Sequence, residues 1–206
     1  KSPVKDSVVV NDRWGKECRS NHGGYYTSEY GKVDVHGKSL GMDKKWEECR
    51  GMGDSFGYNR NENIYDYKSS KELIHIFIDI VSKGGNLCLN VGPRADGVIP
   101  PIMQQRLIDI GKWLNINGEA IYGTEPLEDK DIQKNIYCTK KHDNIYAITT
   151  EWPGKNLTLN TCDISSDSEI TLLGNNTKLK WKYDNNKLCI DTSTITPSMI
   201  SCRYAY

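Results

Sequence analysis

The chain has 206 residues, of which 37% are hydrophobic and 26% are charged, and its Lys+Arg and Asp+Glu counts are both 27. This composition predicts a packed core and not a disordered chain. The net charge of zero argues against a general nucleic-acid binder. No apolar run in the sequence reaches the roughly 18 residues of a membrane-spanning helix, so we expect no membrane partner.

The first strand-like stretch combines a valine run with a polar cluster. Val8-Val9-Val10 predicts a strand over residues 7–11 that is buried on both faces, as in a parallel sheet. Asn11-Asp12-Arg13-Trp14 follows at the end of that strand, and ligands of barrels and doubly wound sheets bind at such ends. We expect these side chains to point into a pocket. Because a buried-type strand follows directly on the opening residues, we also expect an N-terminal part to be missing.

The first 120 residues alternate strand and helix patterns. Residues 15–31 are expected to be a long loop, and residues 45–50 a short strand. A helix should begin at Ser69 or Ser70 and end at Lys83-Gly84-Gly85, since its apolar residues recur at helical spacing. Residues 86–91 follow as a buried strand, and Pro100-Pro101 begins a second helix that Asn117-Gly118 ends. This order predicts an α/β fold with parallel strands.

After Gly123 the pattern changes to short strands that recur about every 8–12 residues, which is typical of an antiparallel β-sandwich. The expected strands cover residues 136–138, 144–150, 157–159, 169–173, 179–183 and 187–190. No helix is expected in residues 125–206. We therefore divide the chain into an α/β domain at residues 1–124 and an all-β domain at residues 125–206.

The seven cysteines form no C-x-x-C pair, so a zinc ribbon is not expected, and at least one is unpaired within the chain. Cys88, between two leucines, is predicted to be a buried free thiol. Asn156-Leu157-Thr158 and Asn175-Asn176-Thr177 are glycosylation sequons, which matter only on the secretory route. Neither G-x-G-x-x-G nor a Walker pattern occurs, and we expect no cofactor and no metal.

Six blocks of the first 125 residues stand out: Val8–Gly15, Gly23–Tyr30, Lys45-Trp46-Glu47, Ser55–Arg60, Gly84–Pro93 and Asn117–Gly123. In their order and approximate spacing these blocks resemble the α-L-fucosidases of glycoside hydrolase family 29. The resemblance covers about residues 1–125, and the remainder matches the family's C-terminal β-sandwich in character.

The resemblance implies retaining hydrolysis of terminal α-L-fucose from glycans by a (β/α)8-like barrel followed by a β-sandwich. This chain would supply the last barrel strands and the sandwich, and its partner would be the missing N-terminal half of the barrel. The family nucleophile is an aspartate in a Trp-x-Asp type segment, which does not occur in these residues. We therefore expect the chain alone to be inactive. The family also implies the secretory route, with a lysosomal or extracellular location, and leaves a homo-oligomer open.

Two glutamates are candidates for the acid/base, because a retaining glycosidase needs a carboxyl group that donates and then accepts a proton. Glu29 aligns with the acid/base of bacterial relatives and is expected on a mobile loop among tyrosines, although an ordinary solvated Glu is the alternative. Glu47 is the second candidate, with a structural carboxylate bonded to Arg or backbone donors as its alternative. Asp12 is expected to be structural.

Three further residues are expected to bind the sugar. Arg13 matches the family arginine that hydrogen-bonds the fucose ring, and a strand-end salt bridge is the alternative. Phe56 matches the aromatic wall for the fucose C6 methyl, with core packing as the alternative, and Trp46 is expected beside it. His22 and His36 are assigned no role.

Two rival functions remain at this level. The first is a non-catalytic carbohydrate-binding paralogue with a lectin-like β-sandwich, for which Trp152 and Trp181 are available but no cluster of stacking residues is evident. The second is a related glycosidase of altered specificity, against which Arg13 and Phe56 argue.

Overall fold

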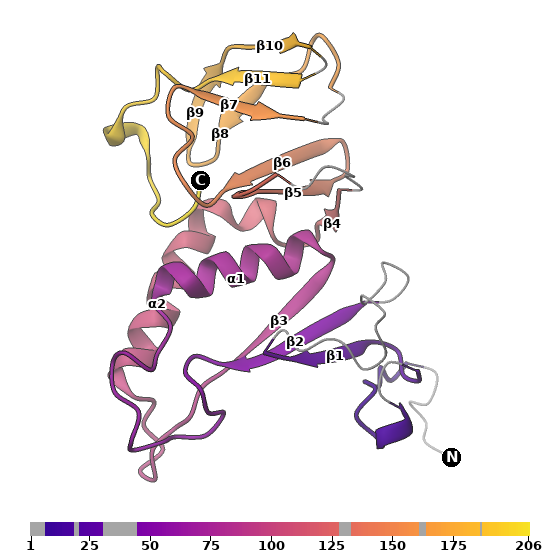
Figure 1. The fold of residues 1–206 in the computed structure, drawn as a ribbon, viewed down its shortest axis with the longest axis vertical. Helices are drawn as coiled ribbons and strands as arrows, with labels where there is room; N and C mark the ends of the chain where they lie inside the picture. The colour runs from indigo at the N-terminus through magenta and orange to yellow at the C-terminus, as the bar shows by residue number, and fades with distance from the viewer. Residues whose placement is uncertain (1–6, 19–20, 31–44, 128–132, 161–163, 186) are drawn as a thin grey trace. The chain divides into compact units, whose positions relative to one another are not determined.

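The computed structural model describes residues 7–18, 21–30, 45–127, 133–160, 164–185 and 187–206 (Figure 1). The chain forms two compact units, one of residues 1–68 and 83–103 and the other of residues 69–82 and 104–206. Each is described by itself. The first contains parallel strands and the second helices with antiparallel strands, so the chain combines α/β and all-β structure. These units do not test the domain boundary predicted at residues 124–125.

A three-stranded parallel sheet organises the first unit, in the order β1 (Tyr26–Glu29), β2 (Trp46–Gly51) and β3 (Gly85–Asn90). Strands β2 and β3 confirm the strands predicted at residues 45–50 and 86–91. Because all three strands run in the same direction, their carboxyl ends at Glu29, Gly51 and Asn90 meet at one edge of the sheet (Figure 1).

The central strand β2 has two chemically different faces, because successive side chains point to opposite sides of a strand. Trp46, Glu48 and Arg50 are buried on one face, where Arg50 pairs with Glu48 at 3.1 Å. Glu47 and Cys49 are half-buried on the other face. On the neighbouring strands, the residues that pair in register with Glu47 and Cys49 therefore point to the same face of the sheet as these two residues.

The strand predicted at residues 7–11 is wrong. Val8 and Val9 are 56% and 71% exposed, and this stretch makes a parallel bridge between Asn11 and Tyr25 and a hydrogen bond from the Gly24 N–H to the Val10 carbonyl at 2.6 Å. Strand β1 lies inside residues 15–31, which were predicted to be a loop, and a short 3₁₀ helix at Lys16–Cys18 precedes it. A valine run favours a strand only where a neighbouring strand pairs with it along its length, whereas these contacts involve Val10 and Asn11 at the end of the run.

The first predicted helix is confirmed as α1 (Ser70–Ser82). Ser69 and Glu72 form a reciprocal cap, since the Glu72 carboxylate accepts from the Ser69 backbone at 2.8 Å and the Glu72 N–H donates to the Ser69 hydroxyl at 3.2 Å. The helix ends just before Gly84, whose φ of 77° is the left-handed conformation that glycine favours.

The second predicted helix is α2 (Pro101–Asn117), followed by a 3₁₀ turn at Gly118–Ala120. Trp113 of α2 is 2% exposed and donates its indole N–H to the Ala205 carbonyl at 3.0 Å. It belongs to an apolar cluster with residues of α1, of β6 (Asn144–Thr149) and of the C-terminal segment. This cluster is the core of the second unit's helical part. Among the described ranges, no helix has the length and apolarity needed to cross a bilayer.

Short antiparallel strands fill the rest of the second unit. One sheet has the order β4-β5-β6, a second has β10-β11-β7, and β8 pairs with β9. They pack on a shared apolar cluster around Leu159, Leu179, Leu188 and Ile190. Apart from β6, the bounds are β4 (Glu125–Pro126), β5 (Ile136–Lys141), β7 (Asn156–Leu159), β8 (Ile170–Leu172), β9 (Asn175–Leu179), β10 (Trp181–Asp184) and β11 (Lys187–Asp191).

The predicted series of short β-strands after Gly123 is confirmed, with three differences. Strand β4 was not predicted, and the single strand expected at residues 179–183 is the end of β9 followed by β10. A 3₁₀ turn at Pro197–Met199 lies where no helix was expected. Both differences in strand count come from short elements of a few residues, whose local sequence carries too few alternations to be recognised.

Cys88 is exposed, so its prediction as a buried thiol is wrong. Leu87, Cys88 and Leu89 alternate along β3, and the thiol therefore points to the opposite face from the two leucines. Among the described residues, Cys18, Cys49, Cys88, Cys189 and Cys202 are free cysteines.

Candidate functional site

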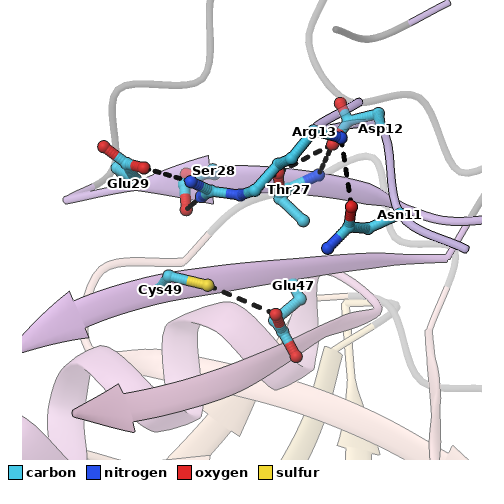
Figure 2. Close-up of polar contacts among 8 residues, drawn as sticks. All are labelled: Asn11, Asp12, Arg13, Thr27, Ser28, Glu29, Glu47 and Cys49. Carbon is cyan, nitrogen blue, oxygen red and sulfur yellow. Dashed lines mark hydrogen bonds and ion pairs between the residues drawn. The ribbon is translucent and has the colours of Figure 1, made fainter. Parts of the chain in front are cut away.

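The candidate site lies on the polar face of the parallel sheet and at its carboxyl edge, where ligands bind in folds with parallel strands. Figure 2 shows the polar contacts that link residues 11–13 to strand β1, and a separate contact between Glu47 and Cys49 within strand β2. Glu29 ends β1 and so stands at this edge, on a strand and not on the mobile loop expected from the sequence.

Asp12 is the buried anchor of this region. It is 0% exposed, and its Oδ1 accepts hydrogen bonds from the Thr27 backbone N–H at 3.0 Å and the Thr27 hydroxyl at 2.7 Å. A buried carboxylate needs such donors, because burial without them is costly. These contacts fasten residues 11–13 to β1 and agree with the structural role expected for Asp12.

Arg13 connects this anchor to Glu29. Its Nε donates to the Thr27 hydroxyl at 2.8 Å, and its Nη1 forms an ion pair with Glu29 Oε1 (Figure 2). Burial alone would lower the pKa of Arg13, but the hydrogen bond and charge of Glu29 raise it overall. The salt bridge that was the alternative for Arg13 is therefore present, and its partner is the first acid/base candidate.

Phe56 lies beyond the end of β2 and next to Tyr30. The two rings are 5.1 Å apart between centroids at an interplanar angle of 64°, and Asn90 donates its side-chain amide to the Phe56 carbonyl. Phe56 is 39% exposed, so plain core packing does not account for it within this chain. An apolar ring at the carboxyl edge can contact a sugar methyl group, which is the role expected from the sequence.

Tyr30 was not predicted as a site residue, although it follows Glu29 directly. Its hydroxyl accepts a hydrogen bond from the Gly51 N–H at 3.0 Å, and the Arg50 guanidinium lies 5.4 Å above its ring centroid. Its φ of 52° is unusual for a non-glycine residue, and such strain is found at functional sites. Tyr30 therefore joins the ends of β1 and β2 and supports Phe56.

Glu47 is on the same face but is set back from the edge. Its Oε1 accepts a hydrogen bond from the Cys49 thiol at 3.2 Å (Figure 2). Burial raises the pKa of Cys49 to about 12, with the hydrogen bond and charge of Glu47 adding to the effect. The thiol is therefore protonated at neutral pH. The structural carboxylate that pairs with an arginine on this strand is Glu48, and not Glu47.

Trp46 lies away from the other predicted sugar-binding residues. It begins β2, is 8% exposed and donates its indole N–H to the Lys83 carbonyl at 3.2 Å, whereas Phe56 follows the opposite end of that strand. The expectation that Trp46 packs beside Phe56 is not met. This position lends no support to a sugar contact by Trp46.

Together the site offers a carboxylate paired with a guanidinium, a nearby aromatic ring and a second carboxylate on the adjacent strand. Such a set can transfer a proton to a leaving oxygen and hold sugar hydroxyl groups. His22 is an exposed loop residue, as expected, and His36 lies outside the described residues.

Comparisons with known proteins show which family the chain resembles along its whole length. A family model described as "Alpha-L-fucosidase" matches residues 1–119, and one described as "Alpha-L-fucosidase C-terminal domain" matches residues 128–206. The tissue alpha-L-fucosidase of Homo sapiens is 41% identical over an alignment of 210 positions, which covers 100% of this chain and 44% of that protein. The alpha-L-fucosidase of Dictyostelium discoideum is 42% identical over 176 residues, covering 84% of this chain and 37% of that protein.

Solved structures give the same result. The Thermotoga maritima alpha-fucosidase in complex with fucose matches with a TM-score of 0.75 and 34% identity, over 91% of this chain and 42% of that one. The same enzyme with a mechanism-based inhibitor matches with a TM-score of 0.76 and 36% identity, over 89% and 41%. The chain thus spans less than half the length of these relatives.

Proposed function

The chain belongs to the α-L-fucosidase family, and from this premise we propose that the protein containing it removes terminal α-L-fucose from glycoconjugates. The observation that carries the proposal is the pairing of Arg13 with Glu29 at the carboxyl edge of the parallel sheet. In the proposed reaction the configuration at the anomeric carbon is retained, through a covalent glycosyl-enzyme intermediate.

Glu29 is the proposed acid/base. It gives its proton to the glycosidic oxygen as the C–O bond breaks, and in the second step it takes a proton from the attacking water. The Arg13 guanidinium stabilises the ionised form of Glu29, which is the form that acts as base. Glu47 is the alternative acid/base, since it lies on the same face of the sheet.

The nucleophile is proposed to come from the part of the relatives that this chain does not match. No Trp-x-Asp segment occurs in the 206 residues. We therefore propose that these residues alone do not turn over substrate, and that their partner is the N-terminal half of a (β/α)8-like barrel. Residues 1–124 would complete that barrel, and residues 125–206 would form the β-sandwich.

The sugar-binding proposal keeps Arg13 and Phe56 from the predicted set. Arg13 retains further N–H donors besides those used by Thr27 and Glu29, and these suit the ring hydroxyls of fucose. Phe56 offers an apolar wall to the C6 methyl that distinguishes a 6-deoxy sugar. A hydroxyl at that carbon would be disfavoured only modestly, by roughly 1–3 kcal/mol.

The decisive experiment compares Glu29→Gln with Glu47→Gln in the full-length protein. Loss of a general acid typically costs about 10²–10⁴-fold in rate, so Glu29→Gln should lower kcat/KM by that factor on a glycan substrate. The loss should be smaller on an aryl α-L-fucoside with an activated leaving group, because such a group departs without protonation. The exposed Glu17 provides a matched control as Glu17→Gln. Full activity of Glu29→Gln together with loss in Glu47→Gln would transfer the role to Glu47.

The non-catalytic carbohydrate-binding paralogue remains the alternative function. The two sandwich tryptophans are half-buried and engaged with neighbours: Trp152 packs edge-on against Tyr206, and Trp181 donates its indole N–H to the Ser168 carbonyl. Binding of a fucosylated glycan by the full-length protein without any turnover would favour this alternative.

The proposed location is the secretory route, in a lysosome or outside the cell. Of the two sequons, Asn156 is exposed at the start of β7. The Asn175 side chain instead donates to the Met199 carbonyl at 3.2 Å and accepts from the Thr177 N–H at 2.8 Å. We therefore expect an N-linked glycan at Asn156. Mass mapping before and after N-glycosidase treatment tests this, and an unmodified Asn156 peptide would count against the location.

A further inference from the structure

Three side chains with metal-binding atoms converge on the polar face of the parallel sheet. They are Glu47 and Cys49 of β2 and Cys88 of β3, and one ligand atom from each lies within 4.8 Å of the others. Figure 2 shows Glu47 and Cys49 directed toward each other. The proposed hydrolysis uses neither sulfur atom.

The backbone explains why these three groups meet. Glu47 and Cys49 are two positions apart on one strand and therefore share a face. Cys88 lies opposite Cys49 in the parallel register, so the two thiols stand side by side on neighbouring strands. Since strand pairing fixes all three positions, little main-chain rearrangement is needed to bring the ligand atoms onto one ion.

We propose that Glu47, Cys49 and Cys88 form a three-ligand site for a thiophilic divalent cation such as Zn²⁺ or Cd²⁺. Soft thiolate ligands select such ions over Mg²⁺ and Ca²⁺, which prefer oxygen. A tetrahedral zinc ion with bonds of about 2.3 Å to sulfur holds two thiolates about 3.8 Å apart. This sulfur–sulfur separation is compatible with the cluster, whose ligand atoms lie within 4.8 Å of one another. Three protein ligands leave the fourth position to water.

Binding of the cation can be balanced by the release of one proton from each thiol, so that the net charge of the site does not change. In the structure both cysteines are free, and the Cys49 thiol donates to the Glu47 carboxylate at 3.2 Å. Binding of one divalent ion releases a proton from each thiol to solvent and forms two metal–sulfur bonds and one metal–oxygen bond. The cluster has a net charge of −1 before and after binding, so the nearby Arg13 and Glu29 experience no change in total charge.

The test titrates the reduced full-length protein with Cd²⁺ and follows the ultraviolet sulfur-to-cadmium charge-transfer band. We expect one equivalent of Cd²⁺ to bind with a band that disappears in Cys88→Ser and in Cys49→Ser. Loss of an outer contact to a metal ligand costs about 10–100-fold in affinity, so loss of a direct ligand should cost at least about 100-fold. Cys88 is exposed, and replacing it with serine is therefore compatible with folding.

Two further variants make the result specific. Cys189→Ser, on β11 in the other unit, should bind Cd²⁺ as the unmodified protein does. Glu47→Gln should keep the sulfur band but bind more weakly, because an amide oxygen is a poorer ligand than a carboxylate. A band that persists in Cys88→Ser, or no band in the reduced protein, would overturn the proposal. The readout is binding alone, so its failure is distinct from a failure of the proposed fucosidase activity.

Discussion

Replacing Thr27 with valine should destabilise the protein, because this hydroxyl links the buried Asp12 to Arg13. Thr27 is 3% exposed, donates to Asp12 Oδ1 at 2.7 Å and accepts from Arg13 Nε at 2.8 Å. Valine keeps the volume and the branching at Cβ. The substitution therefore removes the two hydrogen bonds and changes little else.

The expected magnitude follows from the burial of the two partners. A hydrogen bond to a charged group contributes about 1.5–3 kcal/mol to the free energy of unfolding. Asp12 is 0% exposed, so no water can replace its lost donor, whereas the Arg13 side chain is 30% exposed and can be hydrated. We expect a total loss of about 2–4 kcal/mol, most of it from Asp12.

Thr27→Ser is the matched control, because it keeps the hydroxyl and removes one buried methyl group, at a cost of about 1 kcal/mol. Urea unfolding of both variants in the full-length protein measures the difference between them. Thr27→Val should unfold at clearly lower urea than Thr27→Ser, despite the higher strand propensity of valine. Equal midpoints, or a more stable valine variant, would refute the role assigned to this hydroxyl.

Two other predictions concern packing and pH. In Gly85→Ala the new Cβ would overlap Cζ2 of the Trp46 ring, so we expect the free energy of unfolding to fall by about 1–3 kcal/mol in thermal or urea unfolding. Gly111→Ala, in α2 with open space around it, should instead be neutral or stabilising. The hydrogen bond from Ser70 to Asp109, at 2.6 Å, lowers the pKa of that carboxyl. A lowered pKa adds stability that is fully present above the unfolded value near 4 and is lost as the pH falls through the folded value, so Ser70→Ala should cost about 1 kcal/mol at pH 7 and less at pH 3. An equal cost at both pH values would contradict this.

Local sequence patterns predicted the regular elements well wherever periodicity is long. The helical spacing and the Ser69–Glu72 cap define α1, and its observed bounds, Ser70–Ser82, agree with the prediction. The strands predicted at residues 136–138 and 144–150 are likewise present, as the antiparallel pair β5 and β6. These features depend on interactions between residues close in the chain, so the sequence contains the information needed to recognise them.

The valine run was predicted wrongly because its structure depends on contacts with residues that are distant in the sequence. Residues 8–10 have high strand propensity, but whether they form a strand depends on a neighbouring strand, and the pairing present is limited to the Asn11–Tyr25 bridge and the Gly24–Val10 hydrogen bond among the described residues. Strand β1 was missed because its four residues alternate too briefly to stand out from the surrounding loop.

The sequence by itself determined the family resemblance, the candidate residues Arg13 and Glu29, and the change from an α/β pattern to a series of short β-strands. What only the tertiary structure decided is which of these groups touch. The Arg13–Glu29 ion pair joins residues 16 positions apart, and the Glu47–Cys49–Cys88 cluster joins two strands that are distant in sequence. Strand register sets the second contact, and because a shift of one residue reverses every side chain, no local pattern can specify it. The first depends on the bonds of Asp12 and Arg13 to Thr27, which is likewise distant in sequence.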